Sequence, residues 1–187
     1  MQPKPILKGG TRILRPSEYE QLHEGAKTLD NRTLLDTLLL TGLRFTEARL
    51  FQRHLDWFDS RGFVHLPINA TRKVKRRQRE RWVKLSNKGT TVVPYFFKVR
   101  PLPTWKSWTE DLERWAGRAE LDPTGLSPKS TRKSFESWLI STFPERTLEI
   151  CLSMGHTQTT SLQHYVNMPF NSADKECMKE YVHGWER

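Results

Sequence analysis

The sequence predicts an α+β fold that is mainly α, a helical domain with a small three-stranded antiparallel sheet. Three observations lead to this prediction. Leucines and tryptophans recur at helical spacing in the first and last parts of the chain, and three short strand-like stretches lie between them. The length of 187 residues fits one domain, and an apolar content of 36% argues against disorder throughout.

Residues 1–12 are expected to form a flexible N-terminal tail, because they are mostly polar and include two prolines. The folded domain is then expected over residues 13–187. The chain does not open on the apolar stretch of a signal peptide. Its longest apolar run, residues 34–43, contains Asp36 and is far shorter than the ~20 residues of a membrane span. We therefore expect no membrane segment.

Three helices are predicted in the first third of the chain. Ser17, followed by two glutamates, is typical of a helix start, and this helix runs to about Lys27. A second helix follows Asp30, with leucines at helical spacing, and Gly42 ends it. A third helix begins near Phe45.

The middle of the chain predicts the three strands, at residues 62–68, 81–85 and 92–97. Pro94 makes the third an edge strand, since proline cannot donate a ladder hydrogen bond. Between the first two strands lies TRKVKRRQRER, residues 71–81, with seven basic residues and one acid. We call residues 71–81 the basic run.

The last part of the chain returns to a helical pattern. Trp105, Trp108, Leu112 and Trp115 share one helical face. Prolines in the first turn favour two of the later helix starts. The later helices are predicted at residues 128–142, 144–153, 158–165 and 172–182.

The charge of the chain predicts a polyanionic partner. Its 31 basic and 21 acidic residues give a net charge of +10, which favours nucleic acid. Cys151 and Cys177 lack metal-ligand spacing and favour small buried residues in a reducing compartment. The sequence has no zinc pattern and no phosphate-binding glycine loop. We expect a cytoplasmic, DNA-associated protein, in a prokaryotic cell or a virus-infected host.

Two basic motifs predict phosphate contacts. Arg44, in TGLRFTE, follows the helix stop at Gly42, and Glu47 lies three residues on, where it can orient the guanidinium. Arginine suits phosphate because its planar fork reaches two oxygens and keeps its charge. In PKSTRK, Lys129 and Arg132 share one helical face close to a helix N-terminus, which favours anions.

The third motif is Gly155-His156, with Tyr165 nine residues after the histidine. Histidine can donate a hydrogen bond to a phosphate oxygen at neutral pH. A phenol with an ordinary pKa of about 10 is a poor nucleophile unless nearby cations lower that pKa. In one straight helix the two side chains would be about 13 Å apart, so joint action requires the chain to bend between them.

These motifs, in this order, resemble the catalytic domain of the tyrosine recombinases, the phage-integrase family. Its members typically carry T-G-x-R-x-x-E, then His- or Lys-x-x-Arg, then L-G-H, and a tyrosine nine residues after that histidine. TGLRFTE, KSTR, MGH and Tyr165 match these elements over about 125 residues. The resemblance implies the family's fold for DNA breaking and rejoining.

The resemblance also implies the roles of the site residues. Arg44 and Arg132 would bind the scissile phosphate, and His156 would bond its non-bridging oxygen. Tyr165 would attack, forming a 3′-phosphotyrosine and releasing a 5′-hydroxyl. Lys129 would assist the proton of Tyr165. Glu47 would support these groups, and neither metal, ATP nor other cofactor is implied.

The basic run stands where the family has a β-hairpin with a general-acid lysine. The resemblance implies Lys73 for this role, with Lys75 as the alternative. The run is longer than usual for the family, and it can equally be a ribbon that binds the DNA backbone. The residues expected to bind DNA are Arg72, Lys75, Arg76, Arg77 and Arg79.

Domain organisation and assembly leave alternatives open. The family's N-terminal core-binding domain is expected to be absent, in a fragment or a minimal enzyme, so DNA affinity should be weaker. The partner is double-stranded DNA, with self-association on it as a dimer or tetramer. The segment after Tyr165 would dock on a neighbouring subunit or pack on its own domain.

The expected function is site-specific recombination, such as integration of a viral genome or another mobile element. Two alternatives remain. One is a nicking and closing activity like that of a type IB topoisomerase, performed by a monomer with the same residues. The other is a catalytically silent DNA-binding module that keeps the fold.

Overall fold

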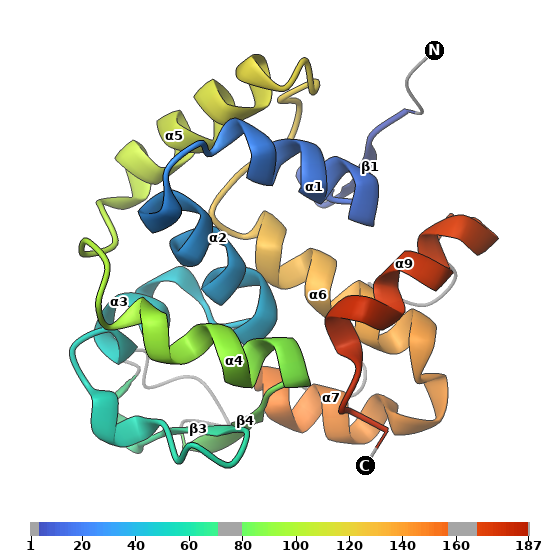
Figure 1. The fold of residues 1–187 in the computed structure, drawn as a ribbon. Helices are drawn as coiled ribbons and strands as arrows, with labels where there is room; N and C mark the ends of the chain where they lie inside the picture. Colours follow the sequence, from blue (N-terminus) through green and yellow to red (C-terminus); the bar gives the residue numbers. More distant parts are fainter. Residues whose placement is uncertain (1–3, 71–79, 157–167, 187) are drawn as a thin grey trace.

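The computed structural model of the chain describes residues 4–70, 80–156 and 168–186. Within these ranges the protein is a mainly helical α+β domain, with eight α-helices and two small two-stranded antiparallel sheets (Figure 1). The predicted class is therefore confirmed, whereas the predicted three-stranded sheet is wrong. No helix in the described part of the chain is long and apolar enough to cross a membrane.

The centre of the core is formed by α2 (Leu29–Thr41) and α6 (Ser130–Thr142), which pack against each other. Most leucines of α2 are completely buried, as its helical spacing predicted. Thr28, and not Asp30, caps the start of α2: its side chain accepts a hydrogen bond from the backbone of Asn31. Gly42 ends α2 in the left-handed conformation, with φ of 56°, as predicted.

Residues 6–13 form a hairpin, although residues 1–12 were expected to be a flexible tail. Strands β1 (Ile6–Lys8) and β2 (Thr11–Ile13) pair antiparallel and are joined by Gly9 and Gly10, both with positive φ. Such a two-residue turn suits glycine and matches the twist of the strands. The hairpin also has an apolar face to bury, because Ile13 is completely enclosed.

The hairpin is fixed to α6 by hydrogen bonds at the residue that follows β2. The backbone NH of Leu14 donates to Ser134 Oγ at 2.7 Å, and Trp138 Nε1 donates to the carbonyl of Leu14 at 2.9 Å. Both side chains come from α6. The N-terminal segment is thus joined directly to a central helix of the core.

Two of the three predicted strands are present. Strands β3 (Phe63–Leu66) and β4 (Arg81–Lys84) pair antiparallel, with Leu66 opposite Arg81. Their side chains alternate between the core and solvent, so that Arg81 and Val83 are buried while Trp82 is exposed.

The third predicted strand, at residues 92–97, lies almost entirely within the helix α4 (Asn87–Phe96). Ser86 caps this helix by accepting a hydrogen bond from the backbone of Gly89. Val93 and Phe96 are buried at helical spacing, and α4 packs against α2 and the last helix. Burial of this helical face outweighs the β preference of the sequence and the backbone hydrogen bond lost at Pro94.

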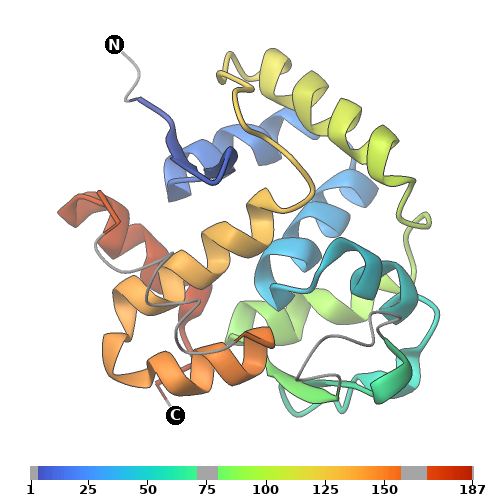
Figure 2. The same ribbon diagram turned by 180° about the vertical axis from the view of Figure 1, so that it is seen from behind.

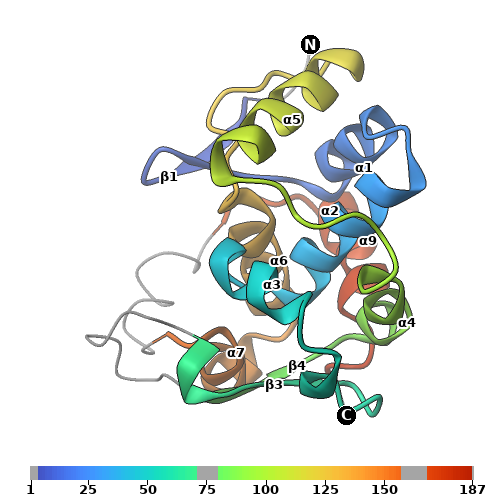
Figure 3. The same cartoon turned by 90° about the vertical axis from the view of Figure 1, so that its left-hand side faces the viewer.

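Helices α1 (Pro16–Gly25) and α5 (Trp105–Arg118) cover one end of the core. Their contact is so close that a Cβ on Gly25 would lie 2.1 Å from the carbonyl oxygen of Trp115. The predicted apolar face of α5 is buried, except that Trp105 is 44% exposed. Figure 3 shows α5 at the end of the molecule opposite the β3–β4 sheet.

The remaining helices follow the prediction closely. α3 (Phe45–Phe51) is short, and α7 (Thr147–Met154) follows a 3₁₀ turn at Pro144–Arg146. α9 (Ser172–Val182) packs against α1, α4 and α6 of its own domain (Figure 2). Its buried contacts include Met178, Tyr181 and Val182. Packing on its own domain is one of the two expected arrangements of the C-terminal segment, and docking on a neighbouring subunit stays a prediction.

Candidate functional site

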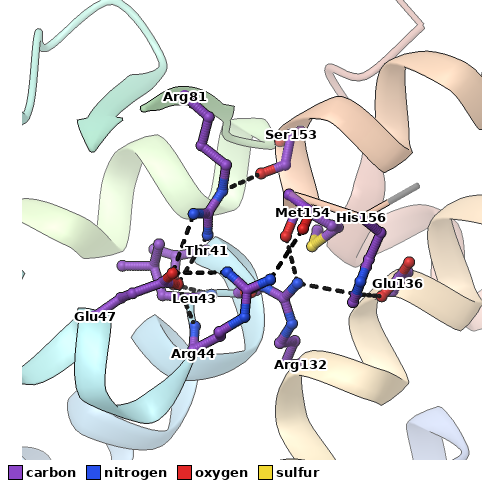
Figure 4. A network of polar contacts seen from close by, with 12 residues as sticks. Thr41, Leu43, Arg44, Glu47, Arg81, Arg132, Glu136, Ser153, Met154 and His156 are labelled. Atoms are coloured by element: carbon purple, nitrogen blue, oxygen red, sulfur yellow. Dashed lines mark hydrogen bonds and ion pairs between the residues drawn. The ribbon is translucent and has the colours of Figure 1, made fainter. Parts of the chain in front are cut away.

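Polar side chains from several elements, far apart in the sequence, meet in one network (Figure 4). They come from the start of α3, the first residue of β4, the first half of α6 and the turn after α7. We call this network the arginine cluster, and its members are Arg44, Glu47, Arg81, Arg132, Glu136 and His156.

Arg44 begins the cluster at the N-cap of α3, where the backbone is extended after the turn at Gly42. Its guanidinium donates from Nη1 to Glu47 Oε1 at 2.7 Å and from Nη2 to the carbonyl of Gly155 at 2.9 Å. The backbone NH of Arg44 donates to Glu47 Oε2 at 2.9 Å. The predicted pairing of Arg44 with Glu47 is therefore confirmed, and the same carboxylate caps the helix.

Arg81 is a member of the cluster that the sequence did not single out as a site residue. Its side chain is 2% exposed and donates to both oxygens of Glu47, at 3.1 and 2.8 Å, and to the carbonyl of Ser153 at 3.0 Å. Arg81 belongs to the basic run, and only the alternation of buried and exposed residues along β4 distinguishes it from its neighbours there.

Glu47 is held between two guanidinium groups and is 1% exposed. Burial alone would raise the pKa of this carboxyl. The hydrogen bonds and charge of Arg81, with the charges of Arg44 and Arg132, outweigh burial and hold the pKa of Glu47 well below its usual range. Glu47 is therefore ionised at neutral pH.

Arg132 is buried and joins the ends of two helices. It donates to the carbonyls of Gly42, after α2, and Met154, at the end of α7. Its Nη2 also lies 3.0 Å from His156 Nε2. Burial, together with the nearby charge of Arg44, lowers the pKa of Arg132 to about 10, so the guanidinium stays protonated at neutral pH.

His156 follows the left-handed Gly155, whose φ is 67°, and its backbone NH donates to the carbonyl of Cys151 at 2.9 Å. Its Nε2 lies 3.1 Å from Oε2 of Glu136, a carboxylate with no exposed surface. Burial lowers the pKa of His156, Glu136 acts in the opposite direction, and Arg132 lowers it further. At neutral pH the imidazole is thus mainly uncharged.

The cluster presents an excess of positive charge at a partly open edge. Three guanidinium groups lie beside two acidic side chains and a mainly uncharged imidazole, so basic groups outnumber acidic ones here. The most accessible side chains are Arg44, 19% exposed, and His156, 20% exposed. An anion that approaches this edge would meet Arg44 and His156 first.

Lys129 is not part of the arginine cluster. It is exposed at the N-cap of α6, three residues before Arg132, and within the described ranges its side chain has no hydrogen-bond partner. The next lysine, Lys133, donates to the carbonyl of Lys8 at 2.7 Å and so joins the first hairpin to α6. The predicted position of Lys129 near the start of a helix is confirmed, but its contact with the site is not.

Several predicted site residues lie outside the described residues. They include Tyr165, the candidate nucleophile, together with the predicted helix at residues 158–165. Among the residues that are described, no group of three or more His, Cys, Asp or Glu side chains could hold a metal ion. The predicted general-acid and DNA-binding residues of the basic run, Arg72, Lys73, Lys75, Arg76, Arg77 and Arg79, also lie outside the described ranges.

No protein-family model matches the chain, and no curated protein matches it. A function for the arginine cluster therefore has to be inferred from its chemistry and from the sequence motifs.

Proposed function

We propose that the protein is the catalytic domain of a tyrosine-type DNA recombinase, which cuts and rejoins double-stranded DNA through a 3′-phosphotyrosine intermediate. The observation that carries this proposal is the convergence of Arg44, Arg132 and His156 in one network. Three separate sequence motifs predicted these three residues as phosphate contacts. Arg132 Nη2 lies 3.0 Å from His156 Nε2, and Arg44 donates to the carbonyl of the preceding Gly155.

The charge of the arginine cluster suits a phosphodiester. Its excess of guanidinium groups over acidic side chains would be compensated by the negative charge of a DNA phosphate. The guanidinium groups are held by Glu47 and by backbone carbonyls, so they are oriented before DNA binds. Fixed cations of this kind stabilise charge that develops in a transition state without further reorganisation.

In the proposed reaction, Tyr165 Oη attacks the phosphorus and the bond from phosphorus to the 5′ oxygen breaks. The phenolic proton passes to a base, for which Lys129 is the candidate. The leaving 5′ oxygen receives a proton from Lys73 or Lys75. Arg44 and Arg132 balance the charge on the phosphoryl oxygens. Since one ester replaces another, the exchange needs no ATP.

A nicking and closing activity of the type IB topoisomerase kind is the second candidate. It would use the same residues in a monomer. The third candidate is a silent DNA-binding module. Covalent capture of DNA separates this module from both enzymes, and relaxation of supercoiled plasmid by a monomer would favour the second candidate.

A nicked suicide substrate tests the proposal directly. After cleavage the short strand diffuses away, so the wild-type protein should remain covalently attached to DNA and migrate as a larger species in a denaturing gel. Tyr165→Phe should give no such species, because it lacks the nucleophilic oxygen. Capture by the phenylalanine variant would show that another residue attacks, and no capture by either protein would favour the silent module.

Arg44→Ala should lower the rate of covalent capture by about 100-fold or more, because it removes a fixed charge from the transition state. Arg49→Ala is the matched control, since Arg49 is an exposed arginine of the same helix. Both variants should bind duplex DNA with similar affinity in a gel-shift assay. Equal capture rates for the two variants would contradict the role of Arg44.

A further inference from the structure

Three lysines gather beside the start of α6, and the reaction as derived so far uses only one of them. Lys129 is exposed at the N-cap of α6, Lys133 lies one turn later on the same helix, and Lys8 ends β1. The Nζ of Lys133 donates a hydrogen bond to the carbonyl of Lys8 at 2.7 Å, which joins the two segments. We call Lys8, Lys129 and Lys133 the lysine cluster.

The lysine cluster is electrostatically unfavourable in the free protein. Within the described ranges none of its three side chains forms an ion pair. Lys129 and Lys133 are four residues apart on one helix, where like charges repel, and the N-terminal end of a helix itself carries partial positive charge. Burial and the charge of Lys129 lower the pKa of Lys133, Glu136 acts in the opposite direction, and Lys8 lowers it further. A bound anion would relieve this repulsion.

The first hairpin fixes the position of the lysine cluster. Arg12 of β2 donates its backbone NH to the carbonyl of Gly125 at 2.7 Å and its Nη2 to Glu18 at 2.8 Å, so the hairpin is held in place before any ligand binds. An ammonium group has three hydrogen-bond donors, and the carbonyl of Lys8 accepts only one of those of Lys133. The other two have no partner among the described residues and can meet an anion.

The location suits a phosphate beside the one expected at the arginine cluster. Lys129 precedes Arg132 by three residues, so the two share a face of α6 and are about 4.5 Å apart along the helix axis. Successive phosphates of one DNA strand are about 3.4 Å apart along the duplex axis. A strand with one phosphate at Arg132 therefore brings a flanking phosphate within reach of a lysine side chain from the lysine cluster.

We propose that the lysine cluster is a second phosphate-binding site, which holds a DNA backbone phosphate that flanks the scissile one. The flanking position rests on the proposed recombinase function, whereas the binding of a phosphodiester by these lysines can be measured without cleavage. The inference also accounts for the place of Lys129, which lies outside the arginine cluster but one turn from Lys133. Lysine suits such a site because its ammonium meets a phosphate as a point charge.

The first measurement is the affinity of the full-length protein for a short unnicked DNA duplex, by fluorescence anisotropy across a range of salt concentrations. Combined replacement of Lys8 and Lys129 by glutamine should lower the logarithmic salt slope by about 0.9, as expected for one lost phosphate contact. The affinity should fall by about fivefold to tenfold at about 0.1 M salt. The control is the combined replacement of Lys106 and Lys175 by glutamine, since both are exposed, on α5 and α9.

The two double variants remove the same charge, so a slope and affinity that match between them would overturn the proposal. Unfolding of the lysine-cluster variant is checked by its melting temperature without DNA. This temperature should not fall at low salt, because the replacement removes like charges that repel each other. A clear fall would also overturn the proposal, since it would show that these lysines already have stabilising partners in the free protein.

The second measurement tests the flanking position. A suicide substrate that carries one uncharged methylphosphonate beside the cleavage point should be captured by the wild-type protein about fivefold more slowly than the unmodified substrate. Lys8→Gln should reduce this difference, because part of the contact is already lost. Lys8 is chosen because Lys129 is also the candidate base of the reaction. Equal sensitivity of both proteins at every flanking phosphate would overturn the flanking position.

The outcomes separate this inference from the proposed function. If the wild-type protein captures no DNA but the lysine-cluster variant has a lower salt slope, the proposed function fails while the phosphate-binding site stands. If the wild-type protein captures DNA and the slope of this variant matches that of the control, the proposed function stands and the lysine cluster is no phosphate-binding site.

Discussion

At the scale of single residues, Glu47 compensates much of the positive charge of the arginine cluster. One buried carboxylate accepts hydrogen bonds from Arg44 and from both Nη atoms of Arg81. Removal of one partner from a buried ion pair usually destabilises a protein by far more than the intact pair stabilises it. The reason is that the remaining charge stays buried without compensation. The guanidinium groups are thus oriented for a ligand by an interaction that also stabilises the fold.

Glu47→Gln should lower the free energy of unfolding at pH 7 by about 3–5 kcal/mol, since Arg81 would lose its buried counter-charge. The folded-state pKa of Glu47 is lowered, so its contribution is present above its ordinary pKa and is lost as the pH falls towards the folded-state value. The difference between wild type and variant should therefore shrink below about pH 4.5.

Urea unfolding at pH 7, 5 and 3 measures this difference. Glu113→Gln provides the control, because Glu113 is an exposed glutamate on α5. A stability difference for Glu47→Gln that stays constant from pH 7 to pH 3 would contradict the assignment of Glu47 as the ionised partner of Arg81.

At the scale of secondary-structure elements, the ends of helices supply the acceptors that hold the arginines. Gly42 ends α2 and Gly155 ends α7, both in the left-handed conformation. Their carbonyls accept hydrogen bonds from Arg132 and Arg44 respectively. The last carbonyls of a helix lack intrahelical partners and carry partial negative charge, so they suit guanidinium groups.

Gly155→Ala tests this arrangement. A Cβ at residue 155 would lie 3.1 Å from the side chain of Arg81, and the positive φ would strain any L-residue. We expect a loss of about 1–2 kcal/mol in stability from the backbone and a clear fall in the rate of covalent capture, because Arg81 and the carbonyl that holds Arg44 must shift.

Gly10→Ala is the matched control for this prediction. Gly10 has a φ of 70°, and a Cβ on it would meet nothing within 4 Å, so its replacement brings the backbone strain without the steric clash. Thermal unfolding should show similar losses for both variants, with the capture rate reduced only at residue 155. An equal capture rate in the two glycine variants would show that the turn after α7 does not control the site.

At the scale of the whole molecule, the net charge of +10 should strengthen DNA binding, and we expect the basic run to make most of the phosphate contacts. Replacement of Arg76, Arg77 and Arg79 by alanine should flatten the dependence of DNA affinity on salt. The logarithmic slope should fall by about 0.9 for each DNA phosphate that the variant no longer neutralises. Fluorescence anisotropy across a range of salt concentrations measures the slope.

The control for this prediction removes the same number of charges elsewhere. Lys106, Arg114 and Lys179 are exposed on α5 and α9, where each pairs with a nearby acid. Their replacement by alanine should leave the slope close to that of the wild-type protein. A slope that responds equally to both triple variants would mean that the basic run is no preferred DNA contact.

Most of the helices could be predicted from the sequence, because leucines and tryptophans that pack into the core recur at helical spacing along the chain. It predicted the wrong structure at residues 92–97, where β-branched and aromatic residues suit a strand locally but α2 offers a helix a surface to pack against. The first hairpin was also missed, although a Gly-Gly pair such as Gly9-Gly10 between two short strand-like stretches is a recognised turn signal.

For the candidate site, the sequence motifs predicted that Arg44, Arg132 and His156 would converge. Arg81 was missed because most of its neighbours in the basic run carry the same charge. Glu136 was missed because nothing in its local sequence indicates that it faces a histidine from another element. Both assignments depend on tertiary packing, which brings β4 beside α7 and α7 beside α6.

The hydrogen bonds that join Leu14 to Ser134 and Trp138 have a mechanical consequence. They attach the first hairpin to the same helix that carries Arg132 and Glu136. A tag or domain fused upstream would therefore be coupled through this short hairpin to the helix that carries Arg132.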